Sequence, residues 1–386
     1  MAFYHRLGKI PPKRHTTLYK DDGKSLYREE LVSALGFSGV YSNKYHIHMP
    51  TQMKAWRELT PINLQNWDEA PLLYYHFFTD GKQSRGDFFS ARNVFMHNEN
   101  FTFATAHVTE NADYFFRNAY AHEYIFVHFG SGELLSEYGR LRFIPGDQII
   151  VPMGTTYQMN FDSFENSKIV VVESDTPYEI PRVFRNDYGQ LLEDAPYCER
   201  DIKLPEYLEP ADAVGDFPVR IKAGSRVFEY IYTHHPFDVV GWDGYLYPYA
   251  FNIKEFAPKV GQIHLPPPVH LAFTTQQFVV CNFCPRLFDF HPESIPAPYF
   301  HTNRDSAEVL YYVEGNFMSR KGIKEGSVTL HPLGIPHGPQ PGKTEESIGK
   351  KDTYEYALMI DTFKPIQVTQ NVRETMDPEY YKSWLE

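Results

Sequence analysis

Two histidines and one glutamate in the C-terminal part of the chain are spaced so that they could hold a metal ion. His301 and Glu308 flank a short polar segment, and His337 follows a turn that contains Pro332 and Gly334. Two imidazoles and one carboxylate are the donors of the non-haem Fe(II) oxygenases, in which further coordination positions stay open. Zn²⁺ accepts the same donors, so the residue types alone leave the metal undecided.

Open positions on such a metal predict a reaction between two bound molecules. A catechol-like or hydroquinone-like substrate can chelate the metal while dioxygen takes a neighbouring position. An encounter of three bodies then becomes an intramolecular step. A lone histidine is more often a satisfied core residue, but three donors at these spacings favour a metal site.

An internal repeat surrounds these residues. The same offsets recur in the N-terminal half, where the donor positions hold different residue types. Glycines, a proline and a glutamate fall in register between the two copies, and chance agreement at so many fixed offsets is improbable. The C-terminal copy is His301-x-Asn303-x4-Glu308-x6-Gly315 with Gly326-x5-Pro332-x-Gly334-x2-His337, and the N-terminal copy is Phe116-x-Asn118-x4-Glu123-x6-Gly130 with Gly146-x5-Pro152-x-Gly154-x2-Tyr157.

Both copies resemble the paired signatures of the cupin superfamily, whose members are double-sheet jelly-roll barrels. The resemblance implies an all-β fold of two cupin barrel halves with few short helices. We expect residues 1–240 to form an N-terminal domain with a degenerate, metal-free barrel and residues 241–386 a catalytic barrel. Asn303 stands where cupins usually carry a second His.

In the N-terminal copy only Glu123 remains from a possible triad, with Phe116 and Tyr157 in the imidazole positions. One carboxylate facing two aromatic rings cannot retain a transition metal against water. We expect side chains to fill this barrel, and Glu123 to turn to solvent or to pair with a cation such as Arg117 or Arg142, because an unpaired buried carboxylate is costly.

The composition and the hydrophobic pattern also favour β structure. Aromatic residues make up 16% of the chain, and Tyr and Phe suit the half-buried surface of a sheet. Near the C-terminus, Asp377 and Pro378 predict the start of a short helix. Short apolar runs bounded by Gly, Pro, Asn or Asp predict antiparallel strands, among them 124–129, 148–151, 168–173, 309–313 and 327–330.

Longer strings in the C-terminal half resemble the homogentisate 1,2-dioxygenase family. The most specific are Pro-Phe-Asp-Val-Val-Gly-Trp at 236–242 and Pro-His-Gly-Pro at 336–339. The similarity extends from Leu-Tyr-Arg-Glu-Glu-Leu at 26–31 to Glu-Tyr-Tyr at 379–381, densely between 235 and 340. It implies an iron-dependent enzyme that inserts both oxygen atoms of O2 into homogentisate and opens the ring to maleylacetoacetate, a step in tyrosine and phenylalanine breakdown.

The resemblance also implies roles for individual residues. His301, Glu308 and His337 correspond to iron ligands, and His264 to a general acid/base that takes a proton from the substrate hydroxyl. A histidine suits that task because its pKa lies near neutrality. The remaining candidates would orient the ligands or contact the substrate: Asn303, His331, Tyr299, Phe317 and Arg286, the last through a substrate carboxylate.

Three departures from the family pattern bear on these roles. The segment between His301 and Glu308 has one residue more than in common members, which leaves Asp305 open as an alternative carboxylate ligand. Asp243 replaces a frequent His. Phe317 stands where the family carries a Tyr that touches the substrate, so the identity of the diphenol is open.

Charge and cysteine content limit the partners. The net charge is −12 and no basic cluster occurs, so we expect neither nucleic acid nor membrane as a partner. Three cysteines form no disulfide framework; Cys281 and Cys284 fit packing thiols better than a redox pair. We expect a cytoplasmic homo-oligomer, a trimer or hexamer by family resemblance. A Zn or Mn isomerase or hydrolase and a non-enzymatic metal-binding bicupin are the alternatives.

Overall fold

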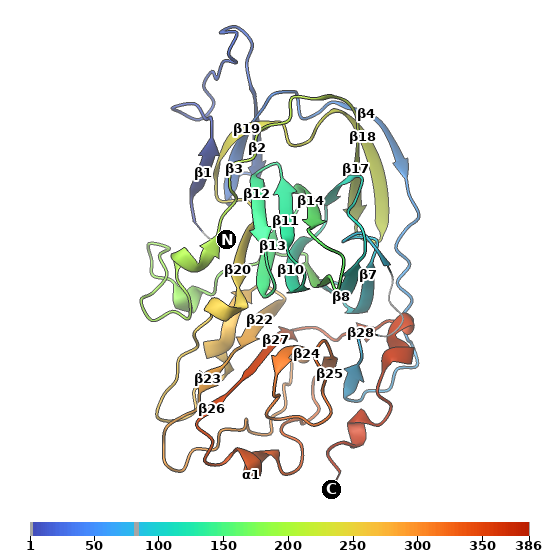
Figure 1. Ribbon diagram of the computed structural model, residues 1–386, viewed down its shortest axis with the longest axis vertical. Coiled ribbons are helices and arrows are strands. Elements are labelled where there is room, and N and C mark those ends of the chain that lie inside the picture. Colours follow the sequence, from blue (N-terminus) through green and yellow to red (C-terminus); the bar gives the residue numbers. More distant parts are fainter. Residues whose placement is uncertain (1–2, 81–84, 386) are drawn as a thin grey trace.

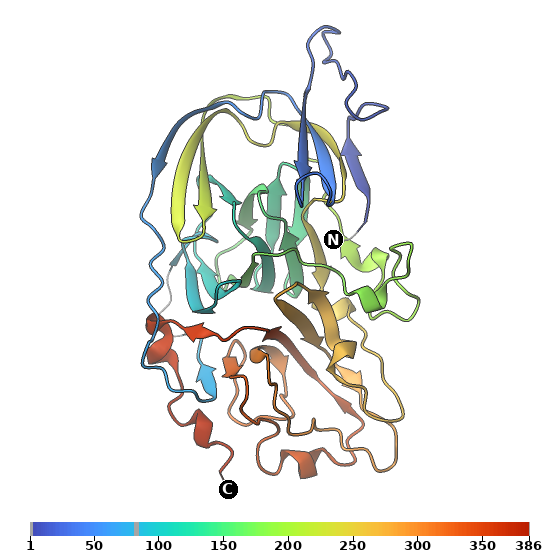
Figure 2. The same ribbon diagram turned by 180° about the vertical axis from the view of Figure 1, so that it is seen from behind.

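The structure is a computed structural model that describes residues 3–80 and 85–385 of the chain. Its two halves stack along the long axis, with the N-terminal half above the C-terminal half in Figure 1 and again in the reverse view of Figure 2. Within the described residues the only α-helix is α1 (Lys343–Ser347), and the other helical turns are of the 3-10 type: 182–184, 199–201, 253–255, 267–270, 370–375 and 380–382.

The N-terminal half consists mainly of two sheets that form a barrel. The first has nine strands, which are, in spatial order, β16 (Ile202–Lys203), β20 (Tyr249–Asn252), β13 (Asp147–Val151), β10 (His122–Phe129), β15 (Lys168–Ser174), β8 (Phe101–Val108), β7 (Arg92–His97) and β28 (Gln367–Val368), with β6 (Arg85–Gly86) beside β8. The second has seven, which are β12 (Gly139–Phe143), β11 (Gly132–Ser136), β14 (Thr156–Phe161), β9 (Phe115–Asn118), β17 (Val214–Ala223), β18 (Arg226–His234) and β4 (Met53–Glu58).

Three smaller sheets make up the rest of the sheet structure in the described residues. A four-stranded sheet at the N-terminal end contains β1 (His5–Gly8), β19 (Val239–Gly244), β3 (Tyr41–His46) and β2 (Arg28–Ser33). The C-terminal half has a six-stranded sheet of β21 (Leu271–Thr274), β22 (Phe278–Phe283), β27 (Glu355–Thr362), β24 (Ala307–Gly315), β25 (Val328–His331) and β5 (Tyr75–Phe77), and a pair of β23 (Arg286–Leu287) with β26 (Asp352–Thr353).

The two halves share one hydrophobic core, formed by alternate side chains of their strands. On β10, Tyr124 and Phe126 belong to the same buried cluster as Val309 and Tyr311 of β24, whereas Ile125 lies in a separate cluster inside the N-terminal barrel. Successive strand residues face opposite sides of a sheet. The nine-stranded sheet therefore packs one face on the C-terminal sheet, and the opposite face of the C-terminal sheet is left for Glu308 and its neighbours.

Two strands are exchanged between the halves. Strand β5, from the N-terminal part of the sequence, pairs with β25 in the C-terminal sheet, and it is the blue strand in the lower half of Figure 1. In return β28, near the end of the chain, pairs with β7 in the N-terminal sheet. The predicted division at residues 240 and 241 remains a prediction, and β20 after it still pairs with β13.

The all-β prediction is confirmed, and all five predicted strands exist as β10, β13, β15, β24 and β25. The C-terminal tail differs from its prediction, because the structure has only a 3-10 turn at 380–382 in place of a helix. Tertiary packing explains the difference. The Trp384 ring lies 4.7 Å from Tyr74, and its Nε1 donates to the carbonyl of Gly338, so the aromatic side chains hold the tail against the C-terminal half.

Candidate metal centre

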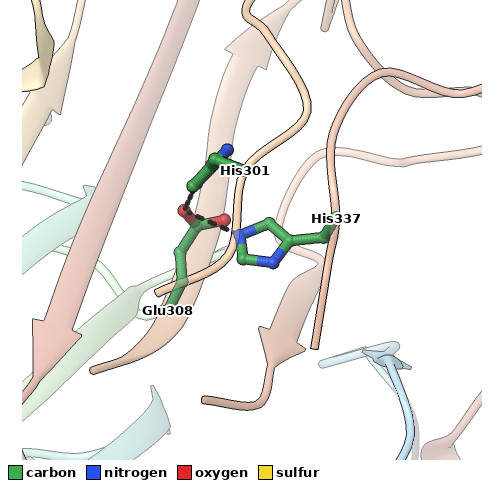
Figure 3. A group of neighbouring side chains, drawn as sticks. All are labelled: His301, Glu308 and His337. Carbon is green, nitrogen blue, oxygen red and sulfur yellow. Dashed lines mark ion pairs between the residues drawn. The ribbon is translucent and has the colours of Figure 1, made fainter. Parts of the chain in front are cut away.

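His301, Glu308 and His337 converge, as the sequence predicts. Their candidate donor atoms all lie within 4.8 Å of one another, and Figure 3 shows the three side chains pointing to a common centre. Glu308 Oε2 is 3.7 Å from His301 Nε2 and 3.6 Å from His337 Nε2. The described residues contain no other such group of three His, Cys, Asp or Glu side chains.

Backbone hydrogen bonds set the separation of the two histidines. The N–H of each donates to the carbonyl of the other at 2.9 Å, which makes an isolated β-bridge between two loops. Glu308 is the second residue of β24, immediately beside this bridge. Gly334 has a φ of 77° and donates its N–H to the carbonyl of Asn303 at 2.7 Å, so the turn before His337 needs a residue without a Cβ.

Hydrogen bonds to backbone carbonyls fix which ring nitrogen faces the centre. His337 Nδ1 lies 3.0 Å from the Ile335 carbonyl, and His301 Nδ1 lies 3.3 Å from the Tyr299 carbonyl. A carbonyl only accepts, so each Nδ1 carries a proton, and Nε2 is the ring atom left to face Glu308 and to bind a metal. His337 Nε2 is buried and has no hydrogen-bond partner in the described structure. Metal-ligating histidines are held in the same way.

The Glu308 carboxylate is held by His331, as the family resemblance implies. His331 Nδ1 donates to Glu308 Oε1 at 2.7 Å, and the Tyr380 hydroxyl lies 3.4 Å from His331 Nε2. Burial lowers the pKa of His331 to about 4, so the ring is neutral at pH 7. Burial alone would raise the pKa of Glu308, but the three surrounding imidazoles outweigh it and keep this carboxylate ionised.

A cavity of about 450 Å³ opens beside the three donors. The other residues that the sequence singled out lie on its wall, except His331, which lies behind Glu308. Phe317 packs its ring 4.7 Å from Tyr312, and Tyr299 lies at the rim with its ring 5.1 Å from His264. The cavity lining includes His264, Arg286, Tyr299, Asn303 and Phe317. One site therefore contains all five of these candidates.

His264 and Arg286 already have partners in the cavity wall. The His264 side chain is 48% exposed, and its Nδ1 is 3.6 Å from Asp289 Oδ2. Arg286 donates to the Cys284 carbonyl at 3.1 Å and lies 3.5 Å from Glu355 Oε1. The guanidinium is therefore not a free cation that waits for a substrate carboxylate.

Two acidic residues in the cavity were not predicted from the sequence. Asp361 on β27 lies directly opposite Glu308 in the sheet, and its Oδ1 has no hydrogen-bond partner among the described residues. Burial and the nearby Glu308 raise the pKa of Asp361 to about 8. Glu355 begins the same strand. Both lie on the same face of one strand, since residues 355, 357, 359 and 361 alternate with Tyr356, Leu358 and Ile360. This period of two is the sequence signal that could have indicated both acidic residues.

Other sequence candidates lie away from the donors. Asp305, the alternative carboxylate ligand, is exposed and outside the group of converging side chains. Cys281 and Cys284 are buried and free. Burial raises the pKa of the Cys284 thiol to about 12, as expected of a packing residue.

In the N-terminal barrel a guanidinium occupies the surroundings of the equivalent glutamate. Arg92 Nη1 lies 2.6 Å from Glu123 Oε1 and 3.2 Å from Glu173 Oε1, and the Tyr157 hydroxyl donates to Glu123 at 2.7 Å. The prediction that Glu123 pairs with a cation is confirmed, but the cation is neither Arg117 nor Arg142, because it comes from β7, outside the repeated segment. Arg117 instead donates to Thr156.

The prediction that side chains fill the N-terminal barrel holds only for its interior. Phe116 and Tyr157 are fully buried there. At its mouth, however, a cavity of about 460 Å³ remains, lined by Arg92, Asn118 and Glu173 among others. The aromatic rings fill the position between the sheets, but they do not reach this opening.

No helix among the described residues has both the length and the apolar character needed to cross a membrane.

Comparisons with known proteins agree with this geometry. Two family models together match most of the chain, homogentisate 1,2-dioxygenase N-terminal over residues 91–253 and homogentisate 1,2-dioxygenase C-terminal over residues 258–386. A Saccharolobus solfataricus protein, whose name identifies it provisionally as a dioxygenase, is 41% identical over 100% of this chain and 99% of its own length. Homogentisate 1,2-dioxygenase of Drosophila melanogaster is 26% identical. The matched region covers 65% of this chain and 60% of that relative.

Among solved structures, a mutant of the oxalate decarboxylase of Bacillus subtilis is similar with a TM-score of 0.35 and 13% identity, over 79% of this chain and 81% of the other. A cupin 2 conserved barrel domain protein from Leptotrichia buccalis gives a TM-score of 0.32 and 10% identity, over 71% and 88% of the two chains.

Proposed function

The chain belongs to the homogentisate 1,2-dioxygenase family, and on this premise we propose that it is an Fe(II)-dependent dioxygenase that opens the ring of a substituted hydroquinone. Homogentisate, which would give maleylacetoacetate, is the reference substrate. The substrate is a proposal because the matched homogentisate dioxygenases are about 24–26% identical and the more similar relative has no named substrate.

One observation supports the proposal above all others. Three donors converge, and both imidazoles turn their Nε2 atoms to the centre while their Nδ1 N–H groups donate to backbone carbonyls. His301, Glu308 and His337 would hold the iron. Bound there, Fe(II) would supply a redox-active centre at which a diphenol and dioxygen can meet.

The residues around the donors would position the substrate. The cavity on this face of the C-terminal sheet can take an aromatic ring against Phe317 and Leu310, which lie on its wall. His331 would fix Glu308 in one orientation through its 2.7 Å hydrogen bond. Asn303 holds the turn before His337 through its carbonyl and faces the same cavity.

His264 would accept a proton from the substrate hydroxyl at the rim of the cavity. A positioned base typically contributes about 10²–10⁴-fold. Since this side chain is half exposed, water can partly replace it, and we expect His264→Ala to lose about 10²-fold in kcat at unchanged iron content. Oxygen uptake and metal analysis of the same preparation test this role. A variant that loses its iron would show that His264 is a ligand instead.

The proposed function is tested by oxygen uptake and metal content on the intact chain. Protein reconstituted with Fe(II) should consume one O2 for each homogentisate or related hydroquinone that is lost, and should hold about one iron per chain, because a single triad is intact. Zn²⁺-loaded protein should be inactive. Uptake equal to that of metal-free protein on every diphenol, or two irons per chain, would contradict the proposal.

The assembly and location of the protein remain proposals as well. By family resemblance we propose a homo-oligomer, a trimer or a hexamer, in the cytoplasm. Light scattering and fractionation measure both.

A further inference from the structure

The cavity at the mouth of the N-terminal barrel takes no part in the proposed reaction, yet it matches the catalytic cavity in size. Its volume is about 460 Å³, against about 450 Å³ beside the metal donors. The repeat also relates parts of the two walls. Glu173 lines the N-terminal cavity and lies opposite Glu123 in its sheet. Asp361 and Glu308 have the same relation in the catalytic cavity.

The buried end of this cavity, its floor, is a hydrogen-bonded network of charged side chains. Arg92 and Lys222 are the cations, and Glu123 and Glu173 are the carboxylates. Lys222 Nζ lies 2.8 Å from Glu173 Oε2, and the lysine side chain is 13% exposed. The Asn118 side-chain amide donates to both glutamates, at 3.4 and 3.0 Å. Two positive and two negative charges leave the floor neutral.

The unused hydrogen-bonding capacity of the floor consists of donors. Each of the four carboxylate oxygens of Glu123 and Glu173 already accepts at least one hydrogen bond. An ammonium group has three N–H donors, and Glu173 is the only acceptor that Lys222 Nζ has among the described residues. A ligand atom that reaches the floor should therefore be a hydrogen-bond acceptor.

The charges around the cavity favour a ligand without a net charge. Among the described residues that line it, Arg92 and Lys222 are the only Lys or Arg side chains, and both are paired. The exposed Glu99 and Asp175 add negative charge at the rim. An anion would be desolvated among carboxylates without an unpaired cation, and a cation would face the N–H groups of the floor. Neither kind of ion would recover its lost hydration.

Above the floor, part of the wall is apolar. Val94, Ala104 and Val171 are neighbours across β7, β8 and β15, and all three line the cavity. Phe89 lines it from the segment before β7. The volume lies within the range of about 300–1,000 Å³ for small-molecule sites. An aromatic ring therefore suits this part of the cavity.

We propose that this cavity is a second binding site, distinct from the metal centre, for an uncharged aromatic carbonyl compound such as an aryl ketone. The carbonyl oxygen would accept a hydrogen bond from Lys222 Nζ, and the ring would lie against Val94, Ala104 and Val171. Binding makes and breaks no covalent bond. The inference does not rest on the proposed dioxygenase reaction, so either can fail without the other.

Four ligands of nearly the same shape test the class of compound. They are acetophenone, 2-phenylpropene, in which a CH2 group replaces the oxygen, benzoate and the 1-phenylethylammonium ion. Isothermal titration calorimetry without oxygen measures the Kd of each for the intact chain. We expect acetophenone to bind about tenfold or more tightly than each of the others, since a hydrogen bond to a charged donor is worth at least that factor. No measurable binding of acetophenone, or an equal or lower Kd for any of the others, would overturn the inference.

Iron distinguishes this cavity from the metal centre. The titration with acetophenone is repeated after reconstitution with Fe(II), whose proposed donors lie in the C-terminal half. The Kd should be unchanged. Binding that appears only with iron, or is lost with it, would place the ligand at the metal centre and contradict the proposal.

A variant of the wall tests the position of the ligand. Val94→Phe puts a larger side chain into the cavity and should raise the Kd of acetophenone about tenfold or more, because the added ring takes the space of the ligand. Val214→Phe is the matched control, since Val214 is 78% exposed on β17 and lies outside the lining. An unchanged Kd in Val94→Phe would show that acetophenone binds elsewhere.

A variant of the floor tests the hydrogen bond. In Lys222→Met, acetophenone should bind no more tightly than 2-phenylpropene, and a retained preference for the ketone would show that Lys222 is not its donor. Glu173 keeps Arg92 and Asn118 as partners, so the fold should survive. Lys54→Met, which breaks an exposed pair with Asp216, is the control. If Lys222→Met does not fold, the ligand series and Val94→Phe still decide the inference.

Discussion

Replacement of His337 by alanine is expected to weaken iron binding more than about 100-fold and to reduce oxygen uptake to that of metal-free protein. Changing a residue that only orients a ligand typically costs about 10–100-fold in metal affinity or activity, so loss of a ligand should exceed this. No neighbour can replace the ring, because His331 already donates to Glu308 and is neutral. Iron per chain after reconstitution and oxygen uptake measure the two effects.

His15→Ala is the control for this variant. The His15 side chain is 97% exposed and pairs only with Glu29, so it should keep both iron and turnover. Far-UV circular dichroism of His337→Ala checks that the fold survives, as we expect, since the backbone bridge between residues 301 and 337 does not depend on the ring. Turnover by a correctly folded His337→Ala protein at the wild-type rate would remove this residue from the ligand set.

A second large effect is expected in the N-terminal barrel, which lacks the two histidine donors of the metal centre. Arg92→Met should lower the free energy of unfolding by about 3–5 kcal/mol, the range seen when one partner of a buried ion pair is removed. The Arg92 side chain is 8% exposed and Glu123 is 1% exposed, so the Glu123 carboxylate would be left buried without its cation. Denaturant unfolding of the iron-free protein at pH 7 measures the loss, and iron per chain in the reconstituted variant should stay at about one.

Two further variants test this interpretation. In the double variant Arg92→Met with Glu123→Gln, much of the stability should return, because the carboxylate that lost its partner is gone as well. Arg226→Met breaks an exposed ion pair with Glu58 and should barely change the transition. If Arg92→Met and Arg226→Met were equally stable, the buried guanidinium would have no structural role.

The metal donors could be predicted from the sequence because they belong to one local motif. Glycines and a proline at fixed offsets set the turns that present His301, Glu308 and His337, and the structure has these turns where expected. Asp361 and Glu355 could not be predicted in this way. They reach the cavity only because β27 pairs with β24, and nothing in the local sequence states which strands become neighbours.

The partner of Glu123 shows the same limit. Arg117 and Arg142 were the natural candidates because they lie within or close to the repeated motif. The cation that binds Glu123 is Arg92, the first residue of β7, which is separated from β10 by β8 and β15 in the nine-stranded sheet. Barrel closure brings such distant strands together, and the length of an arginine side chain then spans the remaining gap.

The exchange of β5 and β28 makes the order of synthesis matter for folding. Strand β28 at 367–368 covers the β7 edge of the N-terminal sheet, so this edge stays unpaired until residues 367–368 have left the ribosome. Strand β5 is made early but has to wait for β25 at 328–331. An unpaired edge is a template for pairing with other chains. During translation, therefore, the barrel without the metal donors is the part of the nascent chain that most needs protection by chaperones.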